Sequence, residues 1–265
     1  MSIPAWIITL NSTAPNVVSL KSSLEEQGFE VAFFDAVDGR KSTPTLEADE
    51  SISQFKSLIN RKAPLTNSEI GCYLSHYRLI KQAYQQGKEH VLIFEDDVII
   101  EPGLFNLVNE ITKLGENAHM VKLMALKIRK RKVLKTLSGD YQLVRPVRGS
   151  LGAQGYVLNR EGMKRILDYG ATLYMPIDKV YDSFFMFDLN SYNIEPHAIY
   201  ETVHESSIKK TKGIIDNRAW VKASWRLNKL HRSILRKLDQ LKHRDEYQGA
   251  TKPSAPPGKS SRLRD

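Results

Sequence analysis

Three consecutive carboxylates, Glu95, Asp96 and Asp97, are the residues of this 265-residue chain best suited to chemistry. Adjacent acids repel one another, and a hard divalent cation relieves that repulsion because such cations prefer carboxylate oxygens. The acids follow an apolar run over residues 91–94, which is typical of a central parallel strand with both faces covered. They would then lie at the carboxyl end of that strand, where open α/β sheets bind their ligands.

Side chains alternate along a strand, so the three acids divide into two groups. Glu95 and Asp97 are expected on one side as the candidate cation ligands, and Asp96 on the other. A strand that simply ends in solvated acids is the alternative. The chain becomes apolar again at residues 98–100 before a turn at 102–103, which favours acids held near a buried surface.

The elements that must position these acids follow an alternating order. Thr66 and Glu69 have the spacing of a capping box and predict the start of a long helix. Residues 127–135 are a run of charge, predicted as solvated surface or a flexible loop, with a phosphate or acceptor contact as the alternative. The alternation of expected strands and helices favours an α/β fold with a right-handed, mostly parallel, Rossmann-like sheet flanked by helices. Strands are expected at 3–10, 30–34, 90–95, 120–126 and 152–158, and helices at 19–27, 66–86, 103–114 and 160–168.

Composition and charge predict where the protein works. Cys72 is the only cysteine, so an internal disulfide is impossible and a reducing compartment is expected. Neither a signal peptide nor an apolar run near the roughly 18 residues of a membrane span is visible, so we expect a cytoplasmic protein. The net charge of +9 belongs to residues 203–265, which hold 16 Lys/Arg against 6 Asp/Glu. A near-neutral body therefore carries a basic C-terminal region.

That basic region predicts a surface helix. We expect the chain to divide into a catalytic domain at 1–208, a basic amphipathic helical region at 209–248 and a disordered tail at 249–265. Basic amphipathic helices with tryptophan are typical of binding to an anionic membrane surface. A helix packed on the enzyme body or on a second subunit is the alternative. The apolar positions, spaced by three and four, are Leu227, Leu230, Ile234, Leu238 and Leu241.

Several motifs in order resemble the family 25 glycosyltransferases, which include bacterial lipooligosaccharide galactosyltransferases. The matching blocks cover about residues 3 to 208 and lie at 33–39, 65–76, 93–98, 152–158 and 176–178. The resemblance implies a GT-A-like fold and transfer of a sugar, commonly galactose from UDP-galactose, with inversion at the anomeric carbon. It also implies Mn²⁺ or Mg²⁺ on the donor diphosphate, a lipid-linked saccharide acceptor and a position on the inner face of a bacterial inner membrane.

Residue chemistry and the resemblance together suggest roles for individual residues. Asp97 and Glu95 are expected to hold the metal, and Asp96 to contact a ribose or organise the turn. Asp178 is the first choice for the base that an inverting transfer needs, with Asp182 and then Asp188 as alternatives. Donor contacts are expected at Leu10, Asp35, Ala36, Asp38, Ser75, His76, Glu95 and Asp96.

Structural roles compete with several of these assignments. Asp178 could be a helix N-cap, His76 a core histidine, and Asp35 and Asp38 turn residues. Cys72 is expected to be a small core residue, and His204 is a further candidate metal ligand. The chain also lacks the arginine that usually follows the first strand of the family.

Two other functions compete with sugar transfer. The basic region could belong to a nucleic-acid-binding protein. Its basic residues lie on an apolar-striped helix without interleaved stacking aromatics, so we expect no nucleic-acid partner. A non-catalytic relative with a decayed site is the third class, which the intact run of three acids disfavours.

Overall fold

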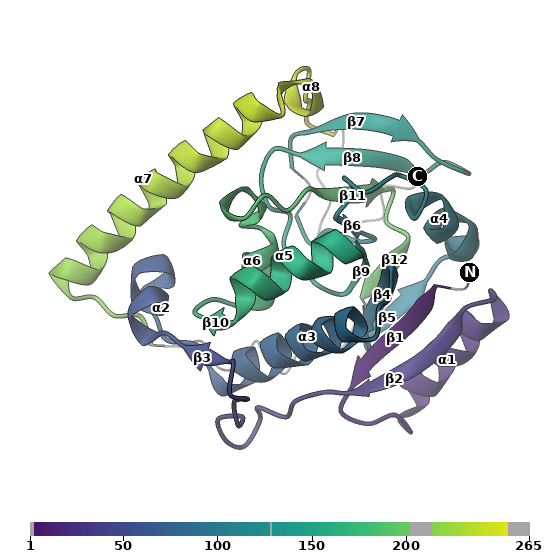
Figure 1. The fold of residues 1–265 in the computed structure, drawn as a ribbon, viewed down its shortest axis with the longest axis horizontal. Helices are drawn as coiled ribbons and strands as arrows, with labels where there is room; N and C mark the ends of the chain where they lie inside the picture. The colour runs from purple at the N-terminus through teal and green to yellow at the C-terminus, as the bar shows by residue number, and fades with distance from the viewer. Residues whose placement is uncertain (1–2, 128, 202–213, 254–265) are drawn as a thin grey trace.

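The computed structural model describes residues 3–127, 129–201 and 214–253, and an eight-stranded mixed sheet forms its centre (Figure 1). Six strands run in one direction, and only β9 and β8 run against them. This sheet confirms the predicted α/β, Rossmann-like fold. In spatial order its strands are β2 (Glu30–Asp35), β1 (Pro4–Thr9), β4 (His90–Glu95), β9 (Gly155–Asn159), β6 (Met120–Lys122), β11 (Ser191–Glu195), β8 (Gln142–Pro146) and β7 (Arg131–Thr136).

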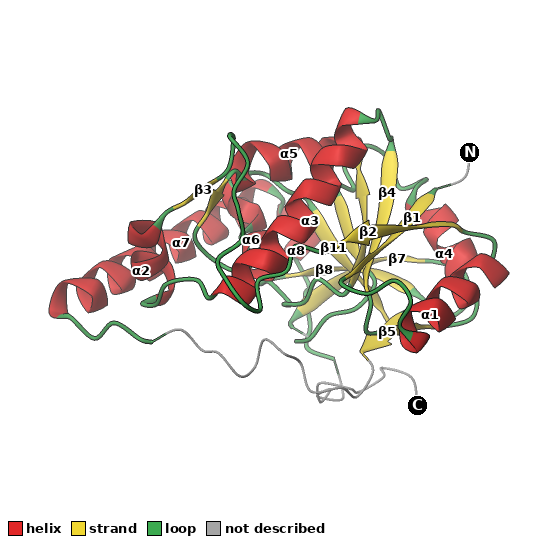
Figure 2. Cartoon of the chain, turned by 90° about the horizontal axis from the view of Figure 1, so that it is seen from below, coloured by secondary structure: helices red, strands yellow, loops and turns green. Residues whose placement is uncertain are grey.

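Helices cover both faces of the sheet (Figure 2). One face packs on α1 and α4, and the other on α3, α5 and α6. Alternate residues of β4 enter the two cores: Leu92 and Phe94 one of them, Val91 and Ile93 the other. The helix bounds are α1 (Pro15–Glu26), α3 (Asn67–Gln85), α4 (Leu104–Ile111), α5 (Arg160–Gly170) and α6 (Ile177–Tyr181).

The strand that carries the acids is central, as predicted, but its two neighbours differ in direction. It pairs parallel with β1 and antiparallel with β9. The expectation of parallel pairing is therefore wrong on the β9 side. An apolar run reports burial on both faces, and burial is the same whichever way the neighbouring strand runs.

The charged run at 127–135 is partly a strand, so the loop prediction is wrong for its second half. Residues 131–136 form β7, which pairs antiparallel with β8 at the edge of the sheet. Lysines at an edge discourage pairing with another chain, which explains a strand that is so rich in charge. Two short pairs complete the β-structure: β3 (Ser51–Ile52) with β10 (Thr172–Leu173), and β5 (Val98–Ile100) with β12 (Ile199–Glu201).

The basic C-terminal region is helical where it is described. Helix α7 (Ala219–Lys242) runs along the outside of the molecule, and the single turn α8 (Arg244–Tyr247) follows it (Figure 1). Helix α7 packs on α2 (Gln54–Arg61) and on the 3₁₀ turn η1 (Phe184–Met186). None of the helices in the described ranges is long and apolar enough to cross a membrane. His204 and most of the predicted disordered tail lie outside the described residues.

Candidate active site

The three acids lie at the carboxyl end of β4. Glu95 is its last residue, and Asp96 and Asp97 form the turn into β5. The Asp96 carboxylate accepts a 2.6 Å hydrogen bond from Thr9 Oγ1 at the end of β1. The Asp96 carbonyl accepts a further bond from the Asn16 side chain. Asp96 therefore ties the turn to β1 and α1.

Glu95 points to the other side of the turn, toward α3. Its Oε1 lies 3.2 Å from Nε2 of His76, whose ring is fully buried. The other ring nitrogen of His76 lies 2.8 Å from the Tyr156 hydroxyl, which lies 2.9 Å from the hydroxyl of Tyr181. A chain of hydrogen bonds thus runs from the acids to α6.

Asp97 shares its surroundings with a fourth acid, Glu201. Strand β12 pairs with β5 so that Glu201 stands opposite Val98. Burial, and then the negative charges of Glu95, Glu201 and Asp96, raise the pKa of Asp97 to about 7. The site therefore gathers negative charge on oxygen donors, and this donor set suits a hard divalent cation such as Mn²⁺ or Mg²⁺.

Cys72 lies beside this group, one helical turn before His76 on α3. The ligand atoms of Cys72, His76 and Glu95 all lie within 4.8 Å of one another. Burial and the charges of Glu95, Asp178 and Asp97 raise the pKa of the Cys72 thiol well above its usual range. A protonated thiol is a poor ligand, so the oxygen donors remain the better candidates for a hard cation.

Two of the candidate bases, Asp178 and Asp182, lie on α6 and directly after it. Asp178 is in its first turn, and burial raises the pKa of its carboxyl. Pro176 occupies the N-cap, so the N-cap role for Asp178 is wrong. Asp182 follows α6, and its carboxylate accepts from the backbone N–H of Leu151 and lies 3.3 Å from Lys122 Nζ.

The third candidate base and two of the donor candidates lie on the surface. Asp188 forms an ion pair with Lys242 of α7, and this pairing lowers the pKa of Asp188. Asp38 is exposed and forms an ion pair with Arg40 that lowers its pKa to about 2. Leu10 is exposed, just after β1.

The remaining donor candidates lie where β2 meets α3. Asp35 ends β2, and the next residue, Ala36, donates its backbone N–H to the Thr9 carbonyl. Ser75 Oγ accepts a 2.8 Å bond from Val37 N and donates to Gly71 O. These bonds hold the loop after β2 on the face of α3.

Two glycines allow the backbone of the loop after β2 to approach the backbone of α3 closely. A Cβ on Gly71 would lie 2.5 Å from Val37 O, and a Cβ on Gly39 would lie 2.0 Å from Asn67 O. Both distances are shorter than real contacts allow, so only glycine permits the backbones to meet here. The packing explains why the blocks at 33–39 and 65–76 contain these glycines.

Sequence reasoning missed several residues of the site. Tyr156, Tyr181, Lys122 and Glu201 come from four different elements, and none of them forms a motif with the acids. Each lies on a strand or helix that patterning can predict, but its place beside the acids depends on strand order. The available sequence signal was a polar side chain, a tyrosine or a lysine, within an otherwise apolar run that predicts a buried strand or helix.

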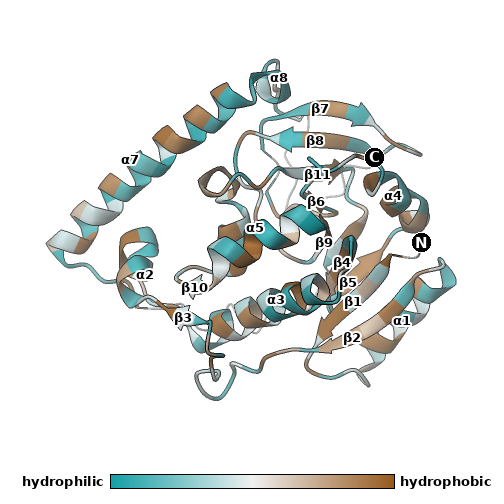
Figure 3. Ribbon diagram, in the orientation of Figure 1, coloured by the Kyte–Doolittle hydropathy of each residue, from teal (hydrophilic) through white to brown (hydrophobic). Residues whose placement is uncertain are grey.

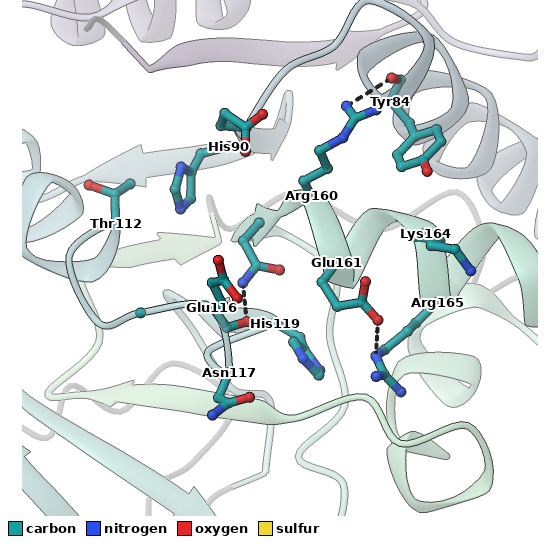
Figure 4. Close-up of a pocket in the computed structure, with 13 residues that line it drawn as sticks. Tyr84, His90, Thr112, Glu116, Asn117, His119, Arg160, Glu161, Lys164 and Arg165 are labelled. Carbon is teal, nitrogen blue, oxygen red and sulfur yellow. Dashed lines mark hydrogen bonds and ion pairs between the residues drawn. The ribbon is translucent and has the colours of Figure 1, made fainter.

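The hollow in Figure 4 lies at the opposite end of β4 from the acids, beside His90. Asn159 and Arg160, at the start of α5, line it together with His119. Arg160 is held by the carbonyl and ring of Tyr84. Because ligands of α/β sheets bind at the carboxyl ends of strands, we assign the chemistry to the acids and not to this hollow.

Comparison with known proteins identifies the family. The family model described as "Glycosyltransferase family 25 (LPS biosynthesis protein)" matches residues 2–181. The chain belongs to glycosyltransferase family 25. It is thus an enzyme of a family that transfers sugars in glycan synthesis, which favours the enzyme over a nucleic-acid-binding protein.

Curated relatives of this family 25 chain come from bacteria and animals. "Lipooligosaccharide biosynthesis protein lic2B" of Haemophilus influenzae is 25% identical over 90% of this chain and 97% of its own length. "Lacto-N-neotetraose biosynthesis glycosyltransferase LgtE" of Neisseria gonorrhoeae is 27% identical over 63% of this chain, which spans only 60% of that protein. "Procollagen galactosyltransferase 2" of Homo sapiens is 29% identical over 69% of this chain and 29% of its own length.

Solved structures are similar only distantly. The A197 protein from STIV covers 77% of this chain and 87% of its own, with 13% identity and a TM-score of 0.41. A Drosophila β-1,4-galactosyltransferase 7 variant, in complex with manganese, UDP-Gal and xylobiose, covers 84% of this chain and 80% of its own. Its identity is 10% and its TM-score 0.40.

Proposed function

We propose that this family 25 enzyme transfers a sugar, galactose as the first candidate, from a UDP-sugar to a saccharide acceptor with inversion at the anomeric carbon. The observation that carries the proposal is the meeting of Glu95, Asp97 and Glu201 at the carboxyl end of β4, beside His76. A nucleotide-sugar donor brings a diphosphate, and clustered oxygen donors next to it suit a cation shared with that diphosphate.

Asp97 and Glu95 are the proposed metal ligands, and Glu201 joins them as a candidate. A bound Mn²⁺ or Mg²⁺ would stabilise the negative charge that develops on the leaving diphosphate. His76 orients Glu95 through Nε2, and Tyr156 fixes the imidazole through Nδ1. Asp96, held by Thr9, keeps the turn in place and is the candidate for a ribose contact.

Asp178 is the proposed base on the acceptor side. Its charge is among those that raise the pKa of the Cys72 thiol, together with Glu95 and Asp97, which supports a place for it near the acids. A carboxyl whose pKa is raised by burial takes a proton more readily than an exposed one. Asp182 is engaged by Leu151 and Lys122, so we propose it as a residue that positions Lys122.

The natural acceptor is proposed to be a lipid-linked saccharide of the lipooligosaccharide type. The names of the bacterial relatives, which refer to lipooligosaccharide and lacto-N-neotetraose biosynthesis, support this class. Such an acceptor would place the enzyme on the cytoplasmic face of a bacterial inner membrane as a peripheral protein. The predicted donor contacts at Asp35, Ala36 and Ser75 belong to the same proposal.

The test is a screen of UDP-sugars with a soluble saccharide acceptor, with and without Mn²⁺, followed by comparison of two variants. Asp97→Asn is expected to lose transfer by at least about a hundredfold while it keeps its fold. Asp168→Asn, an exposed carboxylate of α5, is the matched control and is expected to keep wild-type transfer. Wild-type transfer by Asp97→Asn would remove the proposed metal site.

A further inference from the structure

Helix α7 is amphipathic, but beyond its first turn, where Val221 is buried, its polar side faces the protein. Asn228 donates to Asn60 of α2, Arg232 donates to the Ser183 hydroxyl before η1, and Gln240 donates to the Val147 carbonyl. Asp239, on the same side, is buried and accepts from the Tyr247 hydroxyl. A surface helix of a globular protein normally turns its apolar side to the core, so α7 is inverted.

The apolar side of α7 is exposed as a consequence. We call it the leucine face: Leu227, Leu230, Ile234, Leu238 and Leu241, which are between 49% and 69% exposed. From Leu227 to Leu241 it spans 15 residues, or roughly 21 Å along the helix axis. Figure 3 shows hydrophobic segments alternating with hydrophilic ones along α7, which lies at the edge of the molecule. Single exposed leucines are ordinary, but a continuous row marks an interaction surface.

The apolar surface continues from the leucine face to the N-terminal end of α7 and the residues before it. Trp220 is 42% exposed and stacks on Phe55 of α2, which is 64% exposed. Ile214 and Ile215, just before the helix, are also exposed. Tryptophan is enriched where a protein meets the boundary between lipid headgroups and acyl chains.

A row of exposed cations flanks the leucine face. Lys222, Arg226, Lys229 and Lys237 are exposed and share one side of the helix by their spacing. Seven lysines and arginines lie within α7, and its one acid, Asp239, is turned inward. A second copy of this chain would bring two such cationic rows together, whereas an anionic surface would complement them.

We propose that the leucine face of α7 docks on an anionic lipid bilayer, with its apolar residues in the headgroup region and the flanking cations on acidic lipid. Amphipathic helices with this combination bind in the plane of the interface. Arg232 of α7 also contacts the segment between α6 and η1, so docking would bring the proposed acceptor side near lipid. That last consequence rests on the proposed lipid-linked acceptor, but binding to vesicles does not.

The experiment is sedimentation of the full chain with vesicles of phosphatidylcholine alone or with one quarter phosphatidylglycerol. We expect binding only to the anionic vesicles, and weaker binding in 0.5 M salt. Replacing Leu230, Ile234 and Leu238 together by glutamine should abolish it. Replacing Lys222, Lys229 and Lys237 by glutamine should weaken it about a hundredfold, at about fivefold per residue.

The control replaces Val18 and Val133, two exposed apolar residues of α1 and β7, by glutamine and should bind as wild type. Transfer to a soluble acceptor, measured for each variant, separates failure of docking from failure of the proposed function. Absence of wild-type binding to anionic vesicles, or full binding by the leucine-face variant, overturns the proposal. A wild-type dimer that the leucine-face variant converts to monomer also overturns it, in favour of a second copy.

Discussion

Asp97→Asn should gain stability relative to the metal-free wild type as the pH rises from 5 to 8, while it removes the activity. The pKa of Asp97 rises from 3.8 to about 7 in the folded protein because of burial and the charges of Glu95, Glu201 and Asp96. A raised pKa means that the folded state binds the proton more tightly than the unfolded state does. The stabilisation is therefore complete below pH 3.8 and is lost as the pH rises through 7.

The linkage relation gives the size of the effect. Between pH 5 and pH 8, a single carboxyl with these two pKa values lowers the free energy of unfolding by between about 2 and 3 kcal/mol. Asparagine does not titrate, so the difference in unfolding free energy between Asp97→Asn and wild type should change by that amount in favour of the variant. The baseline difference, which includes the desolvation of the amide, cancels in this comparison.

The assay is urea unfolding in excess EDTA at pH 5 and pH 8, followed by circular dichroism. Asp168→Asn again serves as the control, because this exposed carboxylate should not change with pH relative to wild type. With Mn²⁺ added at pH 8, wild type should gain stability and Asp97→Asn should not. If the difference in unfolding free energy between Asp97→Asn and wild type were the same at pH 5 and pH 8, the proposed crowding of negative charge around Asp97 would be refuted.

Three further expectations concern buried polar residues. Ser75→Ala removes the buried acceptor of the Val37 N–H and should lower the free energy of unfolding by about 1–3 kcal/mol, measured in urea. Burial lowers the pKa of His197 to about 4, so its stabilising effect is present above pH 6.5 and lost as the pH falls toward 4. His197→Gln should therefore reduce the acid destabilisation between pH 7.5 and pH 5 by about 2 kcal/mol, and an unchanged pH profile would count against it. Tyr156→Phe should free Nδ1 of His76, seen by NMR as a mixture of imidazole tautomers; a single unchanged tautomer would show that Glu95 alone fixes the ring.

Local order was readable from the sequence because neighbouring residues decide it. The capping box of Thr66 and Glu69 is formed as predicted, and Asn159 caps α5, since each cap depends on residues three positions apart. The apolar run before Glu95 predicted a doubly covered strand, and its alternate side chains do enter two cores. The run of charge at 127–135 misled, because a strand at an edge needs few apolar residues.

The sequence by itself determined which strand ends in acids and which motifs lie near it. The tertiary structure decided what those acids face. The charge of Glu201 acts on Asp97 because β12 pairs with β5, a pairing of residues about a hundred positions apart. Tyr156 reaches His76 because β9 runs antiparallel beside β4. The same holds for α7: its periodicity marks an apolar stripe, but periodicity is unchanged by rotation about the helix axis, so only packing could show that the stripe faces outward.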